Sequence, residues 1–257
     1  MGKDVALVTG GASGMGQIYA RRLAEQGHDV AIFDLNESGM AETAEHDNIT
    51  AYRCDISNPA AVTEQVAAVE GSLGPVTFLA HAAALMPAHA LADHDAESVV
   101  RLFEVNFFGT VYLIKSLLPG MLERNSGTMV LFGSIAGHAK VPRMGAYCAT
   151  KSAVNTYVEV LQNELAHTDL GIHLVCPPAV NTPLIDQTVA TDTPGSIEEA
   201  RKSGRLADPE KIIDAIERGI SRKRHIIYPG EARFLRLWSD LFPRLWWKTV
   251  MSFEGSR

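Results

Sequence analysis

The chain has 257 residues, of which 46% are hydrophobic and 21% are charged, a composition typical of a globular protein with a large core. Its formal net charge of -7 argues against nucleic acid as a partner, because phosphate binding needs a basic surface. The three cysteines, Cys54, Cys148 and Cys176, form no CxxC pair, so the sequence predicts neither a disulfide framework nor a metal site.

The location that we expect is a reducing, cytoplasmic compartment. Residues 1–10 enter an apolar run of strand length at once, which leaves no room for a signal peptide. No run approaches the roughly 18 apolar residues that a membrane span needs.

Seven short apolar runs alternate with longer amphipathic stretches along the chain. Because the runs are apolar throughout, both faces of their sheet are expected to be covered by helices. The sequence therefore predicts a single α/β domain over 1–257, with a doubly wound, Rossmann-like, seven-stranded parallel sheet. The predicted strands are VALVT (5–9), DVAIF (29–33), ITAYR (49–53), VTFLA (76–80), TMVLF (128–132), IHLVC (172–176) and HIIYP (225–229).

Two of the predicted helices carry end signals. The stretch 18–27 has helical periodicity and ends at Gly27, a residue typical of the position after a helix. The stretch 59–71 begins with Pro59 at its first helical position, and Asn58 is the expected N-cap.

A glycine-rich turn, TGGASGMG (9–16), follows the first strand and opens the first helix. Such a turn lets backbone N–H groups approach a pyrophosphate, and the helix N-terminus favours its negative charge. A tight turn without a ligand is the alternative, but it needs one glycine rather than four. The residues expected at the cofactor are Gly10, Ser13, Gly14, Met15 and Gly16.

Asp34 ends the second strand, 18 residues after Gly16, where an acidic side chain accepts the adenosine ribose hydroxyls of NAD. A 2′-phosphate would meet a like charge there, and no Arg or Lys stands at positions 13, 35 or 36. We therefore expect NAD rather than NADP, with Leu35 beside it. Asp55 and Ile56 follow the third strand and are expected at the adenine edge. Both aspartates could instead be helix N-caps.

The turn TGGASGMG together with YCATK (147–151) resembles the short-chain dehydrogenase/reductase family, and the likeness runs from about residue 3 to about residue 230. The family transfers hydride between a nicotinamide and an alcohol or carbonyl carbon. The resemblance implies catalytic roles for Asn106, Ser134, Tyr147 and Lys151, with Tyr147 and Lys151 also at the cofactor. A turn serine and a buried asparagine that satisfies a backbone group of its own helix are the plain alternatives for Ser134 and Asn106.

Tyr147 is the expected acid/base of this set. Lowering a phenol pKa from about 10 to about 7 takes roughly 4 kcal/mol. One ammonium about 5 Å away supplies roughly 3 kcal/mol at an effective dielectric constant near 20. Lys151 lies four residues along on the same helix face and is thus expected to supply most of this lowering of the Tyr147 pKa. The positively charged nicotinamide is expected to supply the rest. Ser134 would hold the substrate oxygen, and Asn106 a water next to Lys151.

The chain departs from the family pattern at two sites. HAAA (81–84) stands where the family usually has Asn-Asn-Ala-Gly, so His81 takes a cofactor-edge position. Pro177-Pro178 replaces the usual Pro-Gly. The double proline resembles a turn found in reductases of long-chain ketosphingoid bases. Those enzymes prefer the phosphorylated cofactor, which the charge of Asp34 opposes. Pro177, Val180 and Thr182 are the remaining cofactor contacts that the resemblance implies.

The substrate pocket is expected between the segment 138–144 and a lid over 184–207. The stretch 182–207 has turn formers and little periodicity, so we expect a long loop with one short helix. Few fixed charges occur there, which favours a hydrophobic alcohol or ketone. The candidate substrate contacts are Ser134, His138, Met144, Tyr147 and Leu184.

The tail (231–257) concentrates all three tryptophans in a helical pattern that Pro243 interrupts. It could pack on its own subunit, join subunits of a homodimer or homotetramer, or contact a membrane peripherally, where tryptophans and basic residues collect.

These observations favour an NAD-dependent oxidoreductase that interconverts a hydrophobic secondary alcohol and its ketone. The alternatives are an NADPH-dependent reductase of long-chain ketones and a non-catalytic nucleotide sensor with the same fold.

Overall fold

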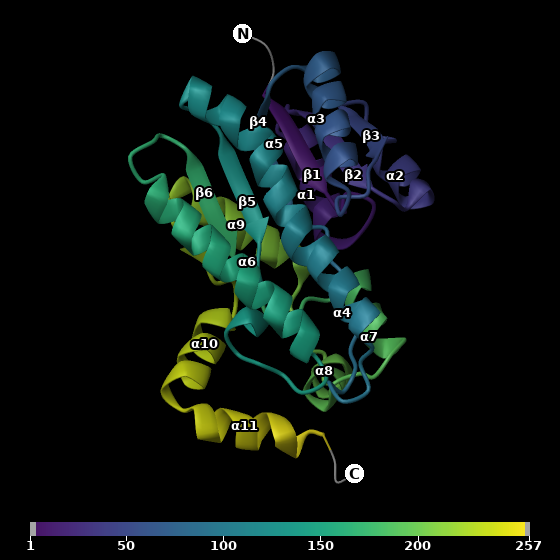
Figure 1. Ribbon diagram of the computed structural model, residues 1–257, viewed down its shortest axis with the longest axis vertical. Coiled ribbons are helices and arrows are strands. Elements are labelled where there is room, and N and C mark those ends of the chain that lie inside the picture. Colours follow the sequence, from purple (N-terminus) through teal and green to yellow (C-terminus); the bar gives the residue numbers. More distant parts are fainter. Residues whose placement is uncertain (1–3, 255–257) are drawn as a thin grey trace.

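A computed structural model describes residues 4–254, so the extreme ends of the predicted domain (1–257) and of the tail (231–257) lie outside the described part. Seven parallel strands form one sheet in the order β3-β2-β1-β4-β5-β6-β7 (Figure 1). This confirms the predicted doubly wound fold, and the order reverses between β1 and β4. The strands are β1 Val5–Thr9, β2 Asp29–Asp34, β3 Ile49–Arg53, β4 Val76–His81, β5 Thr128–Phe132, β6 Gly171–Val175 and β7 Ile226–Ile227.

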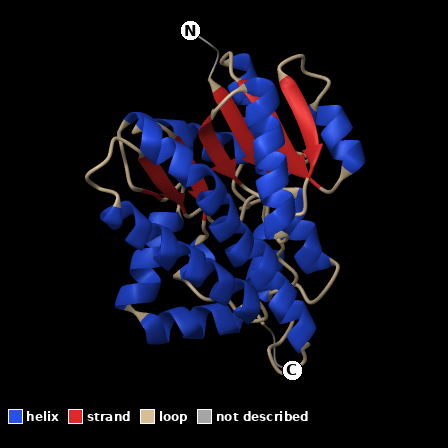
Figure 2. Ribbon diagram, turned by 45° about the horizontal axis from the view of Figure 1, so that its top comes forward, coloured by secondary structure: helices blue, strands red, loops and turns tan. Residues whose placement is uncertain are grey.

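Helices cover both faces of the sheet (Figure 2). The two expected end signals are present: Gly27 has φ +95°, and the Asn58 side chain accepts hydrogen bonds from the Ala60 and Ala61 amides. The helices are α1 Gly14–Glu25, α2 Glu37–Thr43, α3 Pro59–Leu73, α4 Ala96–Phe103, the π-helix η1 Glu104–Phe108, α5 Gly109–Arg124, the 3₁₀ helix η2 Ile135–Gly137, α6 Gly145–Glu164, α7 Pro183–Val189, α8 Gly195–Lys202, α9 Pro209–Ser221, α10 Ala232–Leu241 and α11 Pro243–Ser252.

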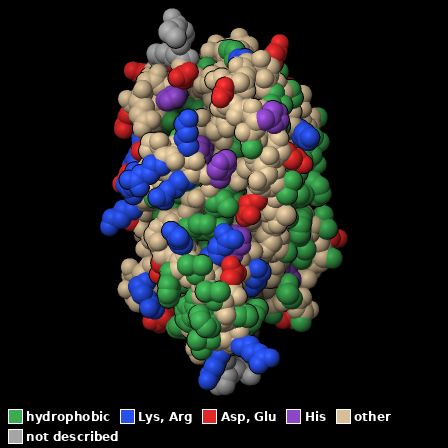
Figure 3. All heavy atoms as spheres, turned by 90° about the vertical axis from the view of Figure 1, so that its left-hand side faces the viewer, with side chains coloured by type: hydrophobic (Ala, Val, Ile, Leu, Met, Phe, Trp, Pro, Cys, Tyr) green, Lys and Arg blue, Asp and Glu red, His purple; other side chains and the backbone are tan. Residues whose placement is uncertain are grey.

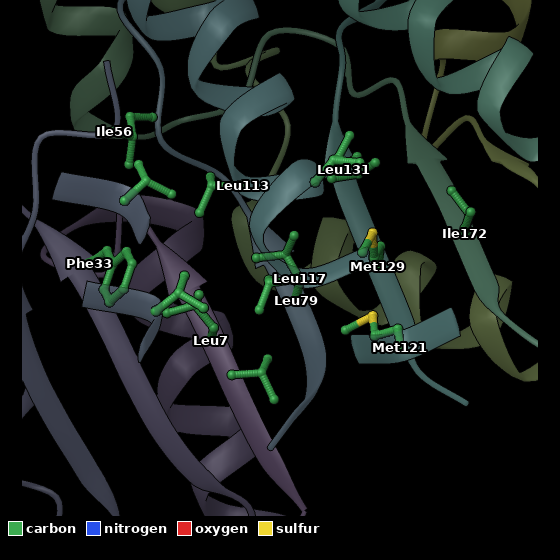
Figure 4. Packing of buried hydrophobic residues seen from close by; sticks show 14 of the residues in the cluster. Leu7, Phe33, Ile56, Leu79, Leu113, Leu117, Met121, Met129, Leu131 and Ile172 are labelled. Atoms are coloured by element: carbon green, nitrogen blue, oxygen red, sulfur yellow. The ribbon is translucent and has the colours of Figure 1, made fainter. Parts of the chain in front are cut away.

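The core has two halves because successive side chains of each strand point to opposite faces. Leu7 of β1 packs with α3, α5 and α6, whereas Ala6 and Val8 pack with α1 and α9. In the first half, Leu113 and Leu117 of α5 lie close to strand residues (Figure 4). The two-sided burial explains the apolar sequences of the inner strands, whereas the edge strand β3 is largely exposed after Ile49.

One helix, Ala96–Arg124, is long and apolar enough to cross a membrane by length and composition alone, and 44% of its most apolar window is buried. It comprises α4, η1 and α5. Its residues Leu113, Ile114 and Leu117 belong to the core. Core helices of globular proteins pass the same test, and its packing assigns this helix to the sheet.

The stretch 182–207 differs from the prediction, because it contains two helices, α7 and α8, rather than one. Pro183 stands at the first position of α7, where its fixed φ suits a helix start. Helices of seven and eight residues are shorter than the window of 11–18 residues in which helical periodicity can be read.

The tail forms two helices, α10 and α11, with Pro243 at the first position of the second. They lie at the end of the molecule far from the N-terminus (Figure 1). Ala232, Trp246 and Val250 pack against Ile135 and Ala139, next to η2. The inner side of the tail is therefore partnered by its own chain.

Candidate active site

A cavity of about 310 Å³ opens at the carboxyl ends of the central strands. It brings together most of the residues that the sequence analysis assigned to the cofactor. Of those, the structure places at its wall Gly10, Ser13, Gly14, Met15, Gly16, Asp34, Leu35, Asp55, Ile56 and Thr182.

The glycine turn requires glycine at two of its positions for reasons of backbone geometry. Gly14 has φ +54°, which L side chains rarely adopt. A Cβ on Gly16 would lie 2.1 Å from the Gly10 carbonyl oxygen. The turn thus packs the start of α1 tightly against β1 and leaves the backbone at the cavity wall uncovered by side chains.

The Asp34 carboxylate is fixed by three backbone amides: it accepts hydrogen bonds from Ala12 at 3.1 Å, Leu35 at 2.7 Å and Asn36 at 3.0 Å. It is not the N-cap of α2, because Asn36 takes that position and accepts from the Gly39 amide. The alternative interpretation of Asp34 as a helix cap is therefore wrong. Its negative charge stays at the cavity wall.

Asp55 has a partner that the sequence analysis missed, Arg101 of α4. The Arg101 guanidinium donates to the Asp55 carboxylate at 3.2 Å and to the Ser57 hydroxyl at 2.5 Å, and it also lines the cavity. Burial alone would raise the pKa of Asp55, but the hydrogen bonds from Ser57 and Arg101 outweigh it and lower the pKa. No motif surrounds Arg101, so only the fold reveals it. The N-cap of α3 is Asn58, not Asp55.

The catalytic candidates Ser134, Tyr147 and Lys151 meet where β5 ends and α6 begins. Burial raises the pKa of Tyr147, and the neighbouring Ser134 side chain acts in the opposite direction. The Ser134 hydroxyl oxygen accepts from the Ala136 amide at 3.1 Å. Lys151 Nζ donates to the Phe132 carbonyl at 2.7 Å and lies 5.9 Å from the centre of the Tyr147 ring.

Burial governs the titration of this group. Desolvation raises the pKa of Tyr147 above its ordinary value and lowers that of Lys151 to about 8. The prediction that Lys151 alone brings the phenol most of the way to neutral pH is therefore wrong. Both charged forms lose hydration in this site, and that loss sets the direction of both pKa shifts.

Asn106 lies in the π-helix η1, a rare distortion that often marks functional sites. Its side-chain oxygen accepts from the Leu85 amide at 2.8 Å, and its Nδ2 donates to the Leu85 carbonyl at 2.9 Å and to Thr150 at 3.1 Å. Its side chain therefore holds the 82–88 segment and α6 in place. The satisfied backbone groups belong to that segment rather than to its own helix.

His81 ends β4, but its imidazole points into the core and does not line the cavity. Nδ1 pairs with Thr9 Oγ1 at 2.7 Å, and Nε2 pairs with Thr110 Oγ1 at 2.9 Å. Burial lowers the pKa of His81 to about 3, so the ring is neutral. This placement corrects the expected cofactor contact of its side chain.

Several further predicted contacts are not part of the cavity wall, among them Tyr147 and Lys151. Pro177 accepts a hydrogen bond from the Ile135 amide through its carbonyl, and Val180 is buried and bridged to Ala207. His138 packs beside Tyr228, with ring centres 6.1 Å apart, on the side of the tail, and burial lowers its pKa to about 4. His138 is thus a packing residue rather than a substrate contact.

The lid lies closed over the catalytic group. Gln187 of α7 accepts from the Met86 amide at 2.7 Å, and Thr191 accepts from the Ala88 amide at 2.9 Å. Tyr147 is only 5% exposed. The side chains that surround it are apolar: Met86, Ala88, Ala136, Met144, Cys148, Leu184 and Ile185. Met144 and Leu184 therefore lie where the substrate contacts were predicted.

Arg143 fastens the far end of the lid. Its Nη1 donates to Asp192 at 3.1 Å and to the Thr193 carbonyl at 3.0 Å, and its Nε lies 2.9 Å from the Glu254 carboxylate. Glu254 also accepts from the Gly195 amide at 2.8 Å. One buried ion pair thus joins the segment before α6, the lid and the end of the tail.

The model of the short chain dehydrogenase family matches residues 4–193. The chain is similar to 2-(S)-hydroxypropyl-CoM dehydrogenase 3 of Xanthobacter autotrophicus, with 31% identity over 224 residues that cover 83% of this chain and 88% of the relative. It is also similar to 17-beta-hydroxysteroid dehydrogenase 13 of Rattus norvegicus, with 33% identity, 98% coverage of this chain and 83% of the relative.

Among solved structures, a short chain dehydrogenase/reductase from Burkholderia phymatum in complex with NAD is similar, with a TM-score of 0.84, 26% identity and 95% coverage of each chain. Other solved structures of this fold are complexes with NADP+ or NADPH. Similar proteins thus bind either nicotinamide cofactor.

Proposed function

Because the chain belongs to the short chain dehydrogenase family and is an oxidoreductase acting on CH–OH groups, we propose that it interconverts a hydrophobic secondary alcohol and its ketone with NAD. The observation that carries this proposal is that Tyr147, with Ser134 acting on its phenol, lies in a buried apolar cluster that shares Leu184 with the wall of the glycine-lined cavity.

NAD, when bound, supplies the hydride acceptor and a positive charge beside the phenol. Its site fits the residues present: an open glycine backbone for the pyrophosphate and the fixed Asp34 carboxylate for the ribose hydroxyls.

Ser134 donates its hydroxyl hydrogen to the substrate oxygen and holds it beside Tyr147. In alcohol oxidation Tyr147 Oη takes the hydroxyl proton, and in ketone reduction it returns that proton. Lys151 keeps a positive charge near the phenolate and so lowers the cost of ionising it. Asn106 is a positioning residue, because it fixes Leu85 and α6 rather than contacting reactants.

The preference for NAD rests on Asp34. A 2′-phosphate would meet its charge at the cavity wall. Arg53 is the neighbour of Asp34 in the sheet, but its side chain pairs with Glu37 and is not part of the cavity wall. The hydrophobic class of substrate rests on the apolar surroundings of Tyr147.

The Tyr147→Phe variant tests the reaction. We expect at least about a 100-fold loss of kcat with NAD affinity nearly unchanged, because only the proton path is cut. Tyr157→Phe, on the same helix, is the control. Turnover is measured with NAD and a series of secondary alcohols from short-chain to long-chain and steroidal. Retained turnover in Tyr147→Phe would contradict the role of Tyr147 as acid/base. Faster oxidation of these alcohols with NADP than with NAD would contradict the proposed cofactor.

We also propose a homo-oligomer, supported by exposed apolar side chains at the end of η1 and on the outer face of α6. Phe108 is 43% exposed and stacks on Tyr112, and Val160 is 50% exposed. Light scattering of the purified protein tests this, and a monomer at micromolar concentration would refute it.

A further inference from the structure

The outward side of α10 and α11 carries an unusual density of apolar side chains. Fifteen large hydrophobic residues are exposed in the described part of the chain, and eight of them belong to this side. Figure 3 shows hydrophobic side chains gathered at this end of the molecule with Lys and Arg around them. We call these residues the tail surface: Phe234, Leu237, Leu241, Phe242, Leu245, Trp247, Met251 and Phe253.

The tail surface is not needed to hold the tail in place. The opposite side of the same helices packs on the protein through Ala232, Trp246 and Val250, and the Trp246 indole donates to the Lys140 carbonyl at 2.8 Å. The two helices are thus anchored, and their outer apolar side faces away from the fold. Patches of this kind mark interaction surfaces.

The charge of this segment has the opposite sign to that of the rest of the molecule. Residues 232–253 contain four basic residues and Asp240, a net charge of +3, so the remainder carries -10 of the total of -7. Arg236 pairs with Asp240. Arg233, Arg244 and Lys248 are exposed on the same two helices as the apolar side chains.

A second copy of the chain fits this surface poorly, because a two-fold contact would bring a charge of +3 against +3. An anionic lipid surface fits both properties. Its headgroups attract the basic residues, and the boundary with the acyl chains accepts tryptophan, phenylalanine and leucine side chains. Helices with this division of residues lie in the plane of a membrane interface rather than across it.

We propose that the tail surface docks this protein on an anionic lipid bilayer. Phe242, Leu245 and Trp247 enter the headgroup region, and Arg233, Arg244 and Lys248 contact phosphate and carboxylate groups. The glycine turn and the sheet remain outside the lipid. The docked side adjoins the lid through Glu254 and Arg143.

Co-sedimentation of the full chain with vesicles tests the proposal. Vesicles of phosphatidylcholine alone are compared with vesicles that contain about 30% phosphatidylserine. We expect binding to the anionic vesicles that weakens steeply between about 0.1 and 0.5 M salt. Equal binding to both compositions, or no binding to either, would overturn the proposal.

Two variants separate charge from apolar contact. Arg233→Gln/Arg244→Gln/Lys248→Gln should weaken binding to anionic vesicles about 100-fold, since each basic residue near such a surface contributes about fivefold. Leu245→Ser/Trp247→Ser should weaken it about as much. The charge-matched control is Lys115→Gln/Lys211→Gln/Arg222→Gln, three exposed positions outside the tail. Circular dichroism and the Tm verify folding.

If the charge-matched control loses as much vesicle binding as Arg233→Gln/Arg244→Gln/Lys248→Gln, the attraction depends on net charge alone and not on the tail surface, and the proposal fails. If Leu245→Ser/Trp247→Ser dissociates an oligomer in solution and leaves vesicle binding unchanged, the tail surface is a subunit interface instead.

Discussion

At the scale of single residues, Tyr147 and the lysine that supports its ionisation are both buried. Tyr147 and Lys151 are 5% and 3% exposed, and burial disfavours the charged form of each. The motif YCATK predicted which residues meet, because a spacing of four places them on one helix face. It did not predict the direction of the Tyr147 pKa, which depends on residues from the lid and the 82–88 segment that close over the ring.

His81 and His138 show why individual side chains were harder to predict than motifs. Each lies at the chain position that was expected, but its ring is turned by partners distant in sequence: Thr9 and Thr110 for His81, and Tyr228 for His138. No local pattern contains such information.

Replacing Asp34 by Ala or Asn tests the cofactor preference. Removal of the charge should shift the ratio of kcat/KM for NAD over that for NADP by about 10- to 100-fold toward NADP. Glu45→Gln, another exposed acid near the end of α2, is the control and should leave the ratio unchanged. Steady-state kinetics with both cofactors measure it, and an unaltered ratio in Asp34→Asn would contradict the role.

His81 should make the stability of the fold sensitive to acid. Its pKa is lowered from 6.5 to about 3, so between these values the unfolded chain binds more protons than the folded one. Stability from this residue is complete above about pH 6.5 and falls as the pH decreases, by about 2 kcal/mol between pH 7 and pH 5.

Urea unfolding at several pH values measures this effect. In His81→Gln, the decrease in the free energy of unfolding between pH 7 and pH 5 should be smaller by about 2 kcal/mol than in the parent chain. In His167→Gln, an exposed control, this decrease should be unchanged. A slope in His81→Gln equal to that of the parent chain would show that the ring titrates normally.

At the scale of elements, the sequence predicted the inner strands well because they are nearly continuous apolar runs, whereas β7 is shorter than predicted and comprises only Ile226–Ile227. The lid was the main error. Neither α7 nor α8 is long enough to show a period, and α8 has no buried residue. The lid is held by contacts to the 82–88 segment and to Arg143 rather than by helix propensity.

Glu254→Gln should loosen the lid, because the Arg143 guanidinium then loses its least exposed anionic partner. Trypsin should cleave after Arg201, Lys202 or Arg205 at least about tenfold faster than in the parent chain, since cleavage follows the population of the open form. KM for the alcohol should rise more than kcat falls.

Asp240→Asn removes an exposed tail carboxylate and serves as the control. Cleavage of Glu254→Gln at the parental rate would mean that the ion pair does not hold the lid.

At the scale of the whole molecule, a sheet covered on both sides positions the cavity at the point where the strand order reverses. This level was the most predictable, because fully apolar strands, helical crossovers and a glycine turn after the first strand all indicate the same fold. The tail was the least predictable, since one amphipathic pattern serves self-packing, subunit contact and lipid contact equally.

Leu117→Ala tests the covering of the sheet by α5. Leu117 is 3% exposed in the core, so the truncation should lower the free energy of unfolding by about 2 to 5 kcal/mol. Leu122→Ala, on the same helix but 38% exposed, should change it by no more than about 0.5 kcal/mol. Denaturant titration compares the two, and similar values for both would contradict the described packing.

The position of the three tryptophans gives the protein a built-in optical probe. Trp238, Trp246 and Trp247 all belong to α10 and α11, and the rest of the chain has none. Intrinsic emission therefore reports on the tail alone, with Trp238 and Trp246 in edge contact at 5.5 Å and Trp247 facing solvent. A spectral shift on adding nucleotide would signal motion transmitted from the lid to the tail, observed without any label.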